Sequence, residues 1–182
     1  MNTLYIEETA CGVNRRKRTL WKKGGACLLS LVLAIGMMLQ LTASAQAAVS
    51  CKSLCQAVLK ETGGEGSLKY KSTKAKDFGG FSASDREKVS SLMYLCDEKE
   101  ACSICVIKAS SNSGAAELLK SLKAYKANNS SSDYLSDYSA SEQKLFKNAV
   151  CGRKGKYVWY IAMSEKKSVN KKGQDVLKQK LS

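Results

Sequence analysis

Apolar side chains recur along this chain with two spacings, and each spacing predicts one type of secondary structure. Residues 51–62 carry apolar side chains three and four positions apart, the pattern of a helix lying on a core, and glycines at 63 and 64 end it. The same spacing over residues 112–129, with lysines toward the C-terminal end, predicts the clearest helix of the chain. Shorter helices are expected over residues 141–150 and 171–182.

Strands are predicted where apolar residues alternate or where β-branched residues gather. Residues 82–95 fit either a helix with a capping box of Ser84 and Glu87 or, as we expect, a single turn at Ser84 followed by a strand. That strand and a β-branched strand over residues 102–109 form a hairpin around a five-residue polar loop. Residues 150–163 are expected to form a second hairpin that turns from Gly152 to Gly155.

The segments between these elements are mostly polar. A long basic connection is expected over residues 65–82, with one short strand around residues 68–71, and a polar loop over residues 130–141. The order of elements predicts an α+β domain, in which a small antiparallel sheet of two hairpins packs helices on one face. Residues 49–182 form this single domain, because about 135 residues can bury one core but not two.

Residues 1–48 have the three parts of an export signal. Six basic residues precede an uncharged stretch over residues 25–49, and small residues offer cleavage after Ala45 or Ala47. The alternatives are an uncleaved membrane anchor, for which the stretch is long enough, and a lipid attached to Cys51. In every case the basic flank keeps the N-terminus cytoplasmic. The domain is therefore expected to be extracytoplasmic, either secreted or anchored to the outer face of the cytoplasmic membrane.

The net charge narrows the choice of partners. The chain has 30 Lys and Arg against 16 Asp and Glu, and removal of residues 1–45 leaves 24 against 14, a net charge of +10. This charge belongs either to a solvated surface or to one that attracts anionic wall polymers or a membrane surface. Nucleic acid is not expected, because no nucleic-acid-binding motif is present. The candidate contacts are Lys69, Lys71, Lys74, Lys76, Lys166, Lys167, Lys171 and Lys172.

Cysteines supply the other candidate chemistry, since the chain has no histidine. An even number of exported cysteines predicts structural disulfides, and Cys96 and Cys102, which flank the first hairpin loop, are the expected pair. A redox Cys-x-x-Cys needs a helix N-terminus, whereas Cys105 lies in a strand. Zinc would need four converging thiolates, so we expect no metal and no cofactor. The disulfide candidates are Cys51, Cys55, Cys96, Cys102, Cys105 and Cys151.

Five short segments carry a resemblance to a known family. They are "ICVIKA" at 104–109, the charged helix through Lys126, "SDY" at 132–134, "NAVC" at 148–151 and "GKYVWYIA" at 155–162. Over residues 83–181 the chain resembles domain of unknown function 4358 (DUF4358), a family of Gram-positive secreted proteins and lipoproteins. The resemblance implies the fold and the location but no activity. Tyr134 and Tyr157 match family positions, where packing is the expected role.

Three functions remain open from the sequence. We expect a noncatalytic cell-envelope domain that binds a partner protein or an anionic polymer through basic loops. The alternative is an extracytoplasmic enzyme such as a thiol oxidoreductase, although no catalytic motif is present and we assign no catalytic residue. The third is a small-molecule or glycan binder that uses Tyr157, Trp159 and Tyr160, an idea that fails if Trp159 and Tyr160 are both buried.

Overall fold

A computed structural model describes residues 49–64 and 68–182, so the predicted export signal over residues 1–48 lies outside the described residues. The described residues belong to one compact unit. Five strands form one antiparallel sheet in the order β1-β2-β3-β5-β4. They are β1 (Tyr70–Ser72), β2 (Val89–Cys96), β3 (Ser103–Ala109), β4 (Val150–Lys154) and β5 (Tyr157–Ala162).

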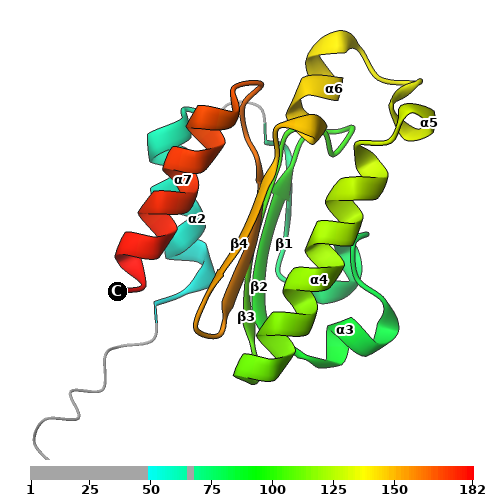
Figure 1. Ribbon diagram of the computed structural model, residues 1–182. Helices are drawn as coiled ribbons and strands as arrows, with labels where there is room; N and C mark the ends of the chain where they lie inside the picture. Colours follow the sequence, from blue (N-terminus) through cyan, green and yellow to red (C-terminus); the bar gives the residue numbers. More distant parts are fainter. Residues whose placement is uncertain (1–48, 65–67) are drawn as a thin grey trace, which may run out of the picture. The chain divides into compact units, whose positions relative to one another are not determined.

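Helices cover both faces of this sheet (Figure 1). On one face lie α2 (Cys51–Thr62) and α7 (Lys167–Lys180), and on the other lie α4 (Asn112–Asn129), α3 (Ala83–Glu87) and the 3-10 turn η2 (Ala75–Asp77). After α4 the chain forms α5 (Ser132–Leu135) and α6 (Ala140–Lys147). The fold class is therefore α+β, with an antiparallel sheet and helices. The two predicted hairpins are present, and pairing of β3 with β5 joins them.

The prediction that helices pack on one face only was wrong. Every residue of β5 from Val158 to Ala162 is fully buried, although successive strand residues point to opposite faces. A strand that is apolar at every position needs an apolar layer on each side. The continuous apolar run in β5 was the sequence signal for a two-sided core.

The close contact of α2 and α7 depends on Gly173. A Cβ atom at this position would lie 2.9 Å from Val58 Cγ1 and 3.3 Å from Thr62 Cγ2. Glycine is costly inside a helix, by about 0.5–1 kcal/mol relative to alanine. Here its missing side chain lets the backbone of α7 approach α2.

Several element boundaries differ from the sequence predictions. α7 begins at Lys167 rather than at residue 171, and α5 lies inside the predicted polar loop. The capping box is made by Ser82 with Asp85, one turn of α3, rather than by Ser84 with Glu87. β4 continues through Gly152, and the hairpin turns at Gly155, whose φ of 55° is left-handed. Local tertiary contacts decide these boundaries, which sequence patterns specify only loosely.

Candidate functional site

The lysines predicted to contact a polyanion fall into two separate groups. Those over residues 69–76 lie in or beside β1 and η2, at one edge of the sheet. Those over residues 166–172 lie at the start of α7, which packs against α2, β4 and β5 toward the opposite edge. The structure therefore does not bring the two segments into one basic surface.

The group beside β1 is partly neutralised. Lys69 Nζ lies 2.6 Å from Glu98 Oε1, and both side chains are exposed. This hydrogen bond raises the pKa of Lys69 and lowers the pKa of Glu98. A further carboxylate, that of Asp77, accepts a 2.6 Å hydrogen bond from the hydroxyl of Ser72. Two acidic side chains thus lie among the lysines of this group.

The group at the start of α7 differs because its lysines are not ion-paired among the described residues, although Glu165 directly precedes Lys166 in the sequence. Lys166 precedes the helix and its side chain makes no capping hydrogen bond, and the first turn holds no Asp or Glu. The four lysines of this group are exposed. None of them forms an ion pair with a carboxylate in the part of the chain that the structure describes.

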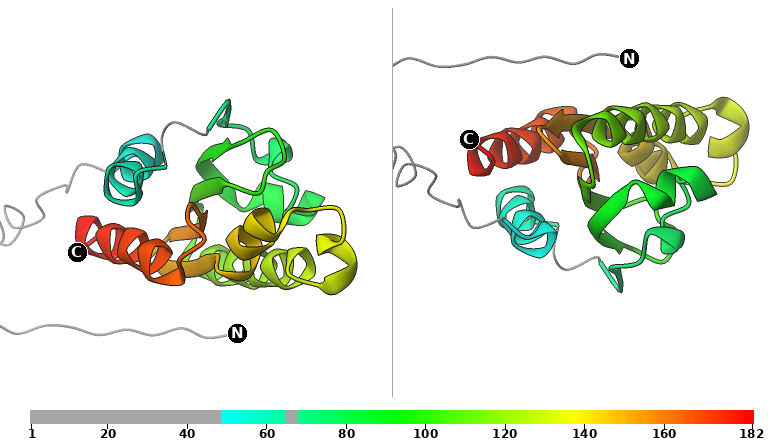
Figure 2. Two further views of the ribbon diagram at one scale, coloured as in Figure 1. Left: turned by 90° about the horizontal axis from the view of Figure 1, so that it is seen from above. Right: turned by 90° about the horizontal axis from the view of Figure 1, so that it is seen from below.

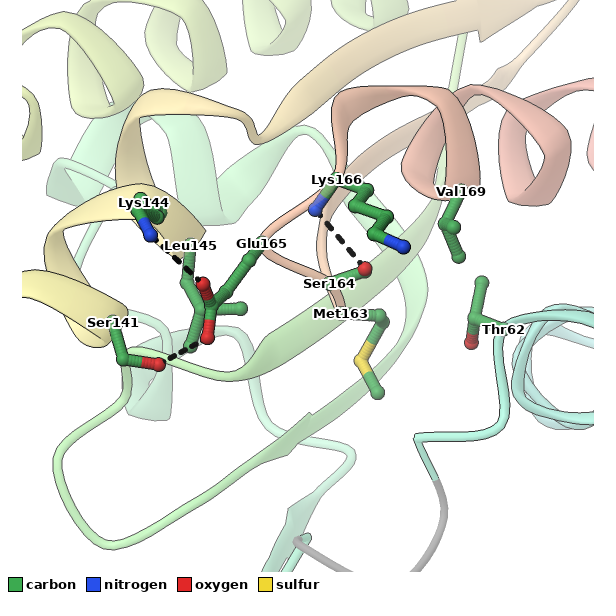
Figure 3. A pocket seen from close by; sticks show the side chains of 9 residues that line it. All are labelled: Thr62, Ser141, Lys144, Leu145, Met163, Ser164, Glu165, Lys166 and Val169. Carbon is green, nitrogen blue, oxygen red and sulfur yellow. Dashed lines mark hydrogen bonds and ion pairs between the residues drawn. The ribbon is translucent and has the colours of Figure 1, made fainter.

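An open groove of about 760 Å³ lies beside this helix start (Figure 3). Its walls come from the end of α2, from α6, from the segment after β5 and from the first turn of α7. They consist of Thr62, Ser141, Lys144, Leu145, Met163, Ser164, Glu165, Lys166 and Val169. Met163 is buried, and the Lys166 backbone N–H donates to Ser164 Oγ at 3.1 Å.

The groove contains a carboxylate that the sequence analysis did not single out. The hydroxyl of Ser141 donates to Glu165 Oε1, and Lys144 Nζ lies 3.4 Å from Glu165 Oε2. The hydrogen bond from Ser141, with help from Lys144, lowers the pKa of Glu165. The groove therefore holds an ionised carboxylate beside two lysines. No sequence signal could have found this group, because α6 meets the segment after β5 only in the folded chain.

The cysteines do not form the disulfides predicted from the sequence. Free thiols are found at Cys51, Cys55, Cys96, Cys105 and Cys151. The expected disulfide between Cys96 and Cys102 is therefore not formed. Each of Cys51, Cys55 and Cys151 instead places its sulfur within hydrogen-bonding range of a backbone carbonyl. These side chains act as small apolar groups within the two cores.

Sheet geometry explains why two of the possible pairs cannot bond. Cys96 belongs to the core under α4, whereas Cys102 belongs to the core under α2 and α7, so the expected pair lies on opposite faces. Cys105 and Cys151 share a face, but Tyr160 of β5 pairs with both of them. They are therefore two strand spacings apart, about 9.5 Å, beyond the roughly 7 Å that a disulfide spans between Cα atoms.

Burial makes these thiols poor nucleophiles. It raises the pKa of Cys151 to about 11, and it also raises the pKa values of Cys51, Cys55, Cys96 and Cys105. A thiolate is the reactive form of cysteine, so a raised pKa lowers reactivity at neutral pH. In residues 49–64 and 68–182, no three His, Cys, Asp or Glu side chains are placed to hold a metal ion.

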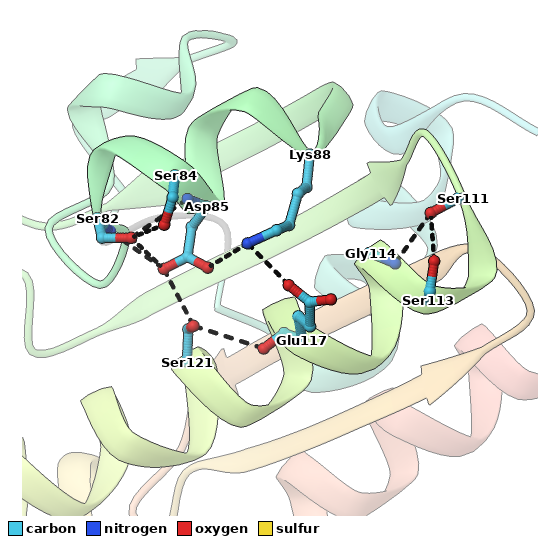
Figure 4. Close-up of polar contacts among 9 residues, drawn as sticks. All are labelled: Ser82, Ser84, Asp85, Lys88, Ser111, Ser113, Gly114, Glu117 and Ser121. Carbon is cyan, nitrogen blue, oxygen red and sulfur yellow. Dashed lines mark hydrogen bonds and ion pairs between the residues drawn. The ribbon is translucent and has the colours of Figure 1, made fainter.

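A second polar cluster joins α3 to α4 (Figure 4). The buried carboxylate of Asp85 accepts hydrogen bonds from Ser82 Oγ at 2.8 Å and from Ser121 Oγ at 3.0 Å. Burial raises the pKa of Asp85, but the hydrogen bonds from Ser82 and Ser121 and the charge of Lys88 outweigh it, so the net pKa is lowered. Lys88 Nζ also lies 2.9 Å from Glu117 Oε2. This cluster is satisfied internally and holds two helices together.

The aromatic residues of β5 do not form a ligand site. Trp159 and Tyr160 are both fully buried, one on each face of the sheet, which excludes the glycan-binding hypothesis. Tyr157 donates from its hydroxyl to the carbonyl of Val49 at 2.6 Å. Tyr134 is partly exposed and stacks on Tyr138. Both tyrosines shared with the resembled family thus take part in local packing.

Comparison with protein-family models, with curated proteins and with solved structures finds no match for this chain. The resemblance to DUF4358 accordingly stays a prediction. Among the described residues, no helix is both long and apolar enough to cross a bilayer.

Proposed function

We propose that this domain binds an anionic polymer or surface outside the cytoplasmic membrane through the lysines at the start of α7. The observation that carries the proposal is the concentration of Lys166, Lys167, Lys171 and Lys172 around a helix start without an acidic residue in its first turn. The domain would act by binding alone, without catalysis.

The helix dipole makes this arrangement unfavourable in isolation. The N-terminal end of a helix is positive, and a cation within the first turn costs about 0.3–1 kcal/mol. Lys166 and Lys167 stand at this end of α7. A bound anion would offset both the dipole and the repulsion among the lysines, because backbone N–H groups and ammonium groups would face it together.

The exposed side of α7, rather than the groove beside it, is the proposed contact. The ionised carboxylate of Glu165 in the groove would repel an anion, and Lys144 is already paired with it. An extended polymer needs no cavity, since repeated weak contacts along its length add up. The surface from Lys167 to Lys172 offers such repeated contacts.

The alternative function, a thiol oxidoreductase, has less physical support. Such an enzyme needs a thiol with a lowered pKa at an accessible position. The raised pKa values of the buried thiols argue against this activity.

The test is retention of the purified protein on immobilised polyphosphate over a range of salt concentrations. Exchange of the four α7 lysines for glutamine is compared with exchange of Lys69, Lys71, Lys74 and Lys76, which removes the same charge from the other edge. We expect retention of the unaltered protein to fall at least about tenfold between 50 and 500 mM NaCl, because exposed charges are screened. The α7 variant should lose most of its binding and the β1 variant much less.

Two results would contradict the proposal. Equal losses in the two variants would mean that binding follows net charge alone. Retention that ignores salt would exclude an electrostatic contact. Vesicles of phosphatidylglycerol, compared with vesicles of phosphatidylcholine, then tell a membrane surface from a soluble polymer.

A further inference from the structure

The two edges of the sheet are unequal. β1 has three residues, whereas β4 has five, all of which pair with β5. β5 is the only strand beside β4 in the sheet that the structure describes. The other side of an edge strand carries unpaired backbone N–H and C=O groups, which can accept another strand. β4 is about 17 Å long, and along it the residues change from buried Val150 to exposed Arg153.

Two helices flank this edge without adding a strand to it. In Figures 1 and 2, α7 and α4 lie on the two sides of β4, whereas β1 lies toward the opposite edge. Cys151 Sγ contacts the carbonyl of Leu122 in α4 at 3.5 Å. Lys154 Nζ donates to the carbonyl of Lys178 in α7 at 2.8 Å. These contacts fix the strand between the helices.

The flanks of this edge are strongly basic. Lys123 and Lys126 of α4 lie near Cys151, where their charges act on its thiol. Arg153 and Lys154 belong to the strand itself, and Lys156 follows it in the turn. The sequence from residue 143 to residue 164 contains no Asp or Glu. The nearby Asp175 is held by Lys178 at 3.2 Å.

We propose that the open edge of β4 binds an extended, acidic peptide segment of a partner protein as a sixth strand of the sheet. Main-chain hydrogen bonds to β4 would supply affinity, as in other cases of strand addition. Carboxylates of the segment would face the lysines of α4 and the basic residues of the hairpin, which supplies charge complementarity.

The same charges argue against two other occupants. A second copy of this chain would bring the basic residues of two β4 strands and two α4 helices close together, and such juxtaposition of like charges is destabilising. An anionic polymer without backbone amides could not form the ladder of hydrogen bonds. This inference does not rest on the polymer-binding proposal, because it uses the β4 edge and Lys123 and Lys126 rather than the α7 lysines.

The probe is a fluorescent peptide of about eight residues that alternates glutamate with threonine. The control peptide has the same sequence, but its alternate backbone amides are N-methylated. N-methylation keeps the charge but removes the donors that a strand needs. We expect the unmodified peptide to bind in fluorescence anisotropy and the methylated peptide not to bind. Amide hydrogen exchange over Val150–Lys154 should slow in the complex.

Charge variants complete the test. Exchange of Lys123 and Lys126 for glutamate should weaken peptide binding at least about tenfold, since both charges flank the strand. The matched exchange of Lys71 and Lys74 for glutamate, at the other edge, should change it by less than about twofold. Four results would each overturn the proposal. The methylated peptide could bind as well as the unmodified one, or the two charge variants could lose binding equally. Amide exchange over β4 could stay unchanged, or the peptide could fail to bind even at millimolar concentration.

Discussion

The two faces of the sheet bury different kinds of side chain. Under α2 and α7 the core is nearly all aliphatic around Trp159, and the helices meet closely at Gly173. Under α4 the core is aromatic, centred on Phe78, and it encloses the hydroxyls of Ser103 and Tyr160, which have no hydrogen-bond partner among the described residues. A buried polar group without a partner costs about 1–3 kcal/mol. The other face encloses one such atom, Trp159 Nε1, which also has no hydrogen-bond partner among the described residues. Unpartnered polar groups therefore reduce the stabilisation from burial on both faces.

This difference predicts which side chains matter most for stability. The first test compares one fully buried apolar side chain from each face, and the later ones test polar groups that are bonded or unbonded in the fold. All three use unfolding in urea, followed by circular dichroism, with the unaltered protein as reference.

The largest effect is expected at the centre of the aromatic core. Phe78 is fully buried, and its ring centroid lies 4.9 Å from that of Phe81 and 5.1 Å from that of Tyr94. Phe78→Ala should lower the free energy of unfolding by about 3–5 kcal/mol. Leu54→Ala, at a fully buried site on the other face, should cost about 2–5 kcal/mol. Because β5 contributes to both cores, each variant should shift one common transition, and separate transitions for the two faces would contradict this.

An intermediate effect is expected at Asp85, which joins α3 to α4. Asp85→Asn should lower the free energy of unfolding by about 1.5–3 kcal/mol at pH 7, because hydrogen bonds to a charged group are lost. The pKa of Asp85 is lowered in the folded protein. Its stabilisation is therefore present above the unfolded pKa of about 3.9 and is lost as the pH falls through the folded pKa. The difference in the free energy of unfolding between the variant and the unaltered protein should disappear in acid. A difference that does not change with pH would contradict this role.

The smallest effects on stability are expected from the removal of two tyrosine hydroxyls, one with a hydrogen-bond partner and one without a partner among the described residues. Tyr157→Phe removes a hydroxyl that donates to Val49, and it should cost about 0.5–1.5 kcal/mol. Tyr160→Phe removes a buried hydroxyl that has no partner among the described residues, so stability should stay the same or rise by about 1 kcal/mol. Equal losses in the two variants would show that the hydroxyl of Tyr160 is hydrogen-bonded.

Much of the local structure followed from the sequence. The helix over Cys51–Thr62 and the helix over Asn112–Asn129 have the predicted bounds, and both hairpins form. The candidate site followed less well. The exposed lysines of α7 were found from composition, but the Glu165 group and the basic edge at β4 were not, because each combines segments that are distant in the sequence.

The sequence by itself determined the periodic elements and the abundance of basic charge, because helix and strand periods are local properties of neighbouring residues. Only the tertiary structure decided that Cys96 and Cys102 lie on opposite faces and that the two lysine segments lie apart. Each of these depends on the order of strands and on which helix packs against which face. That order is settled by burial of apolar surface across the whole domain, to which distant segments contribute together.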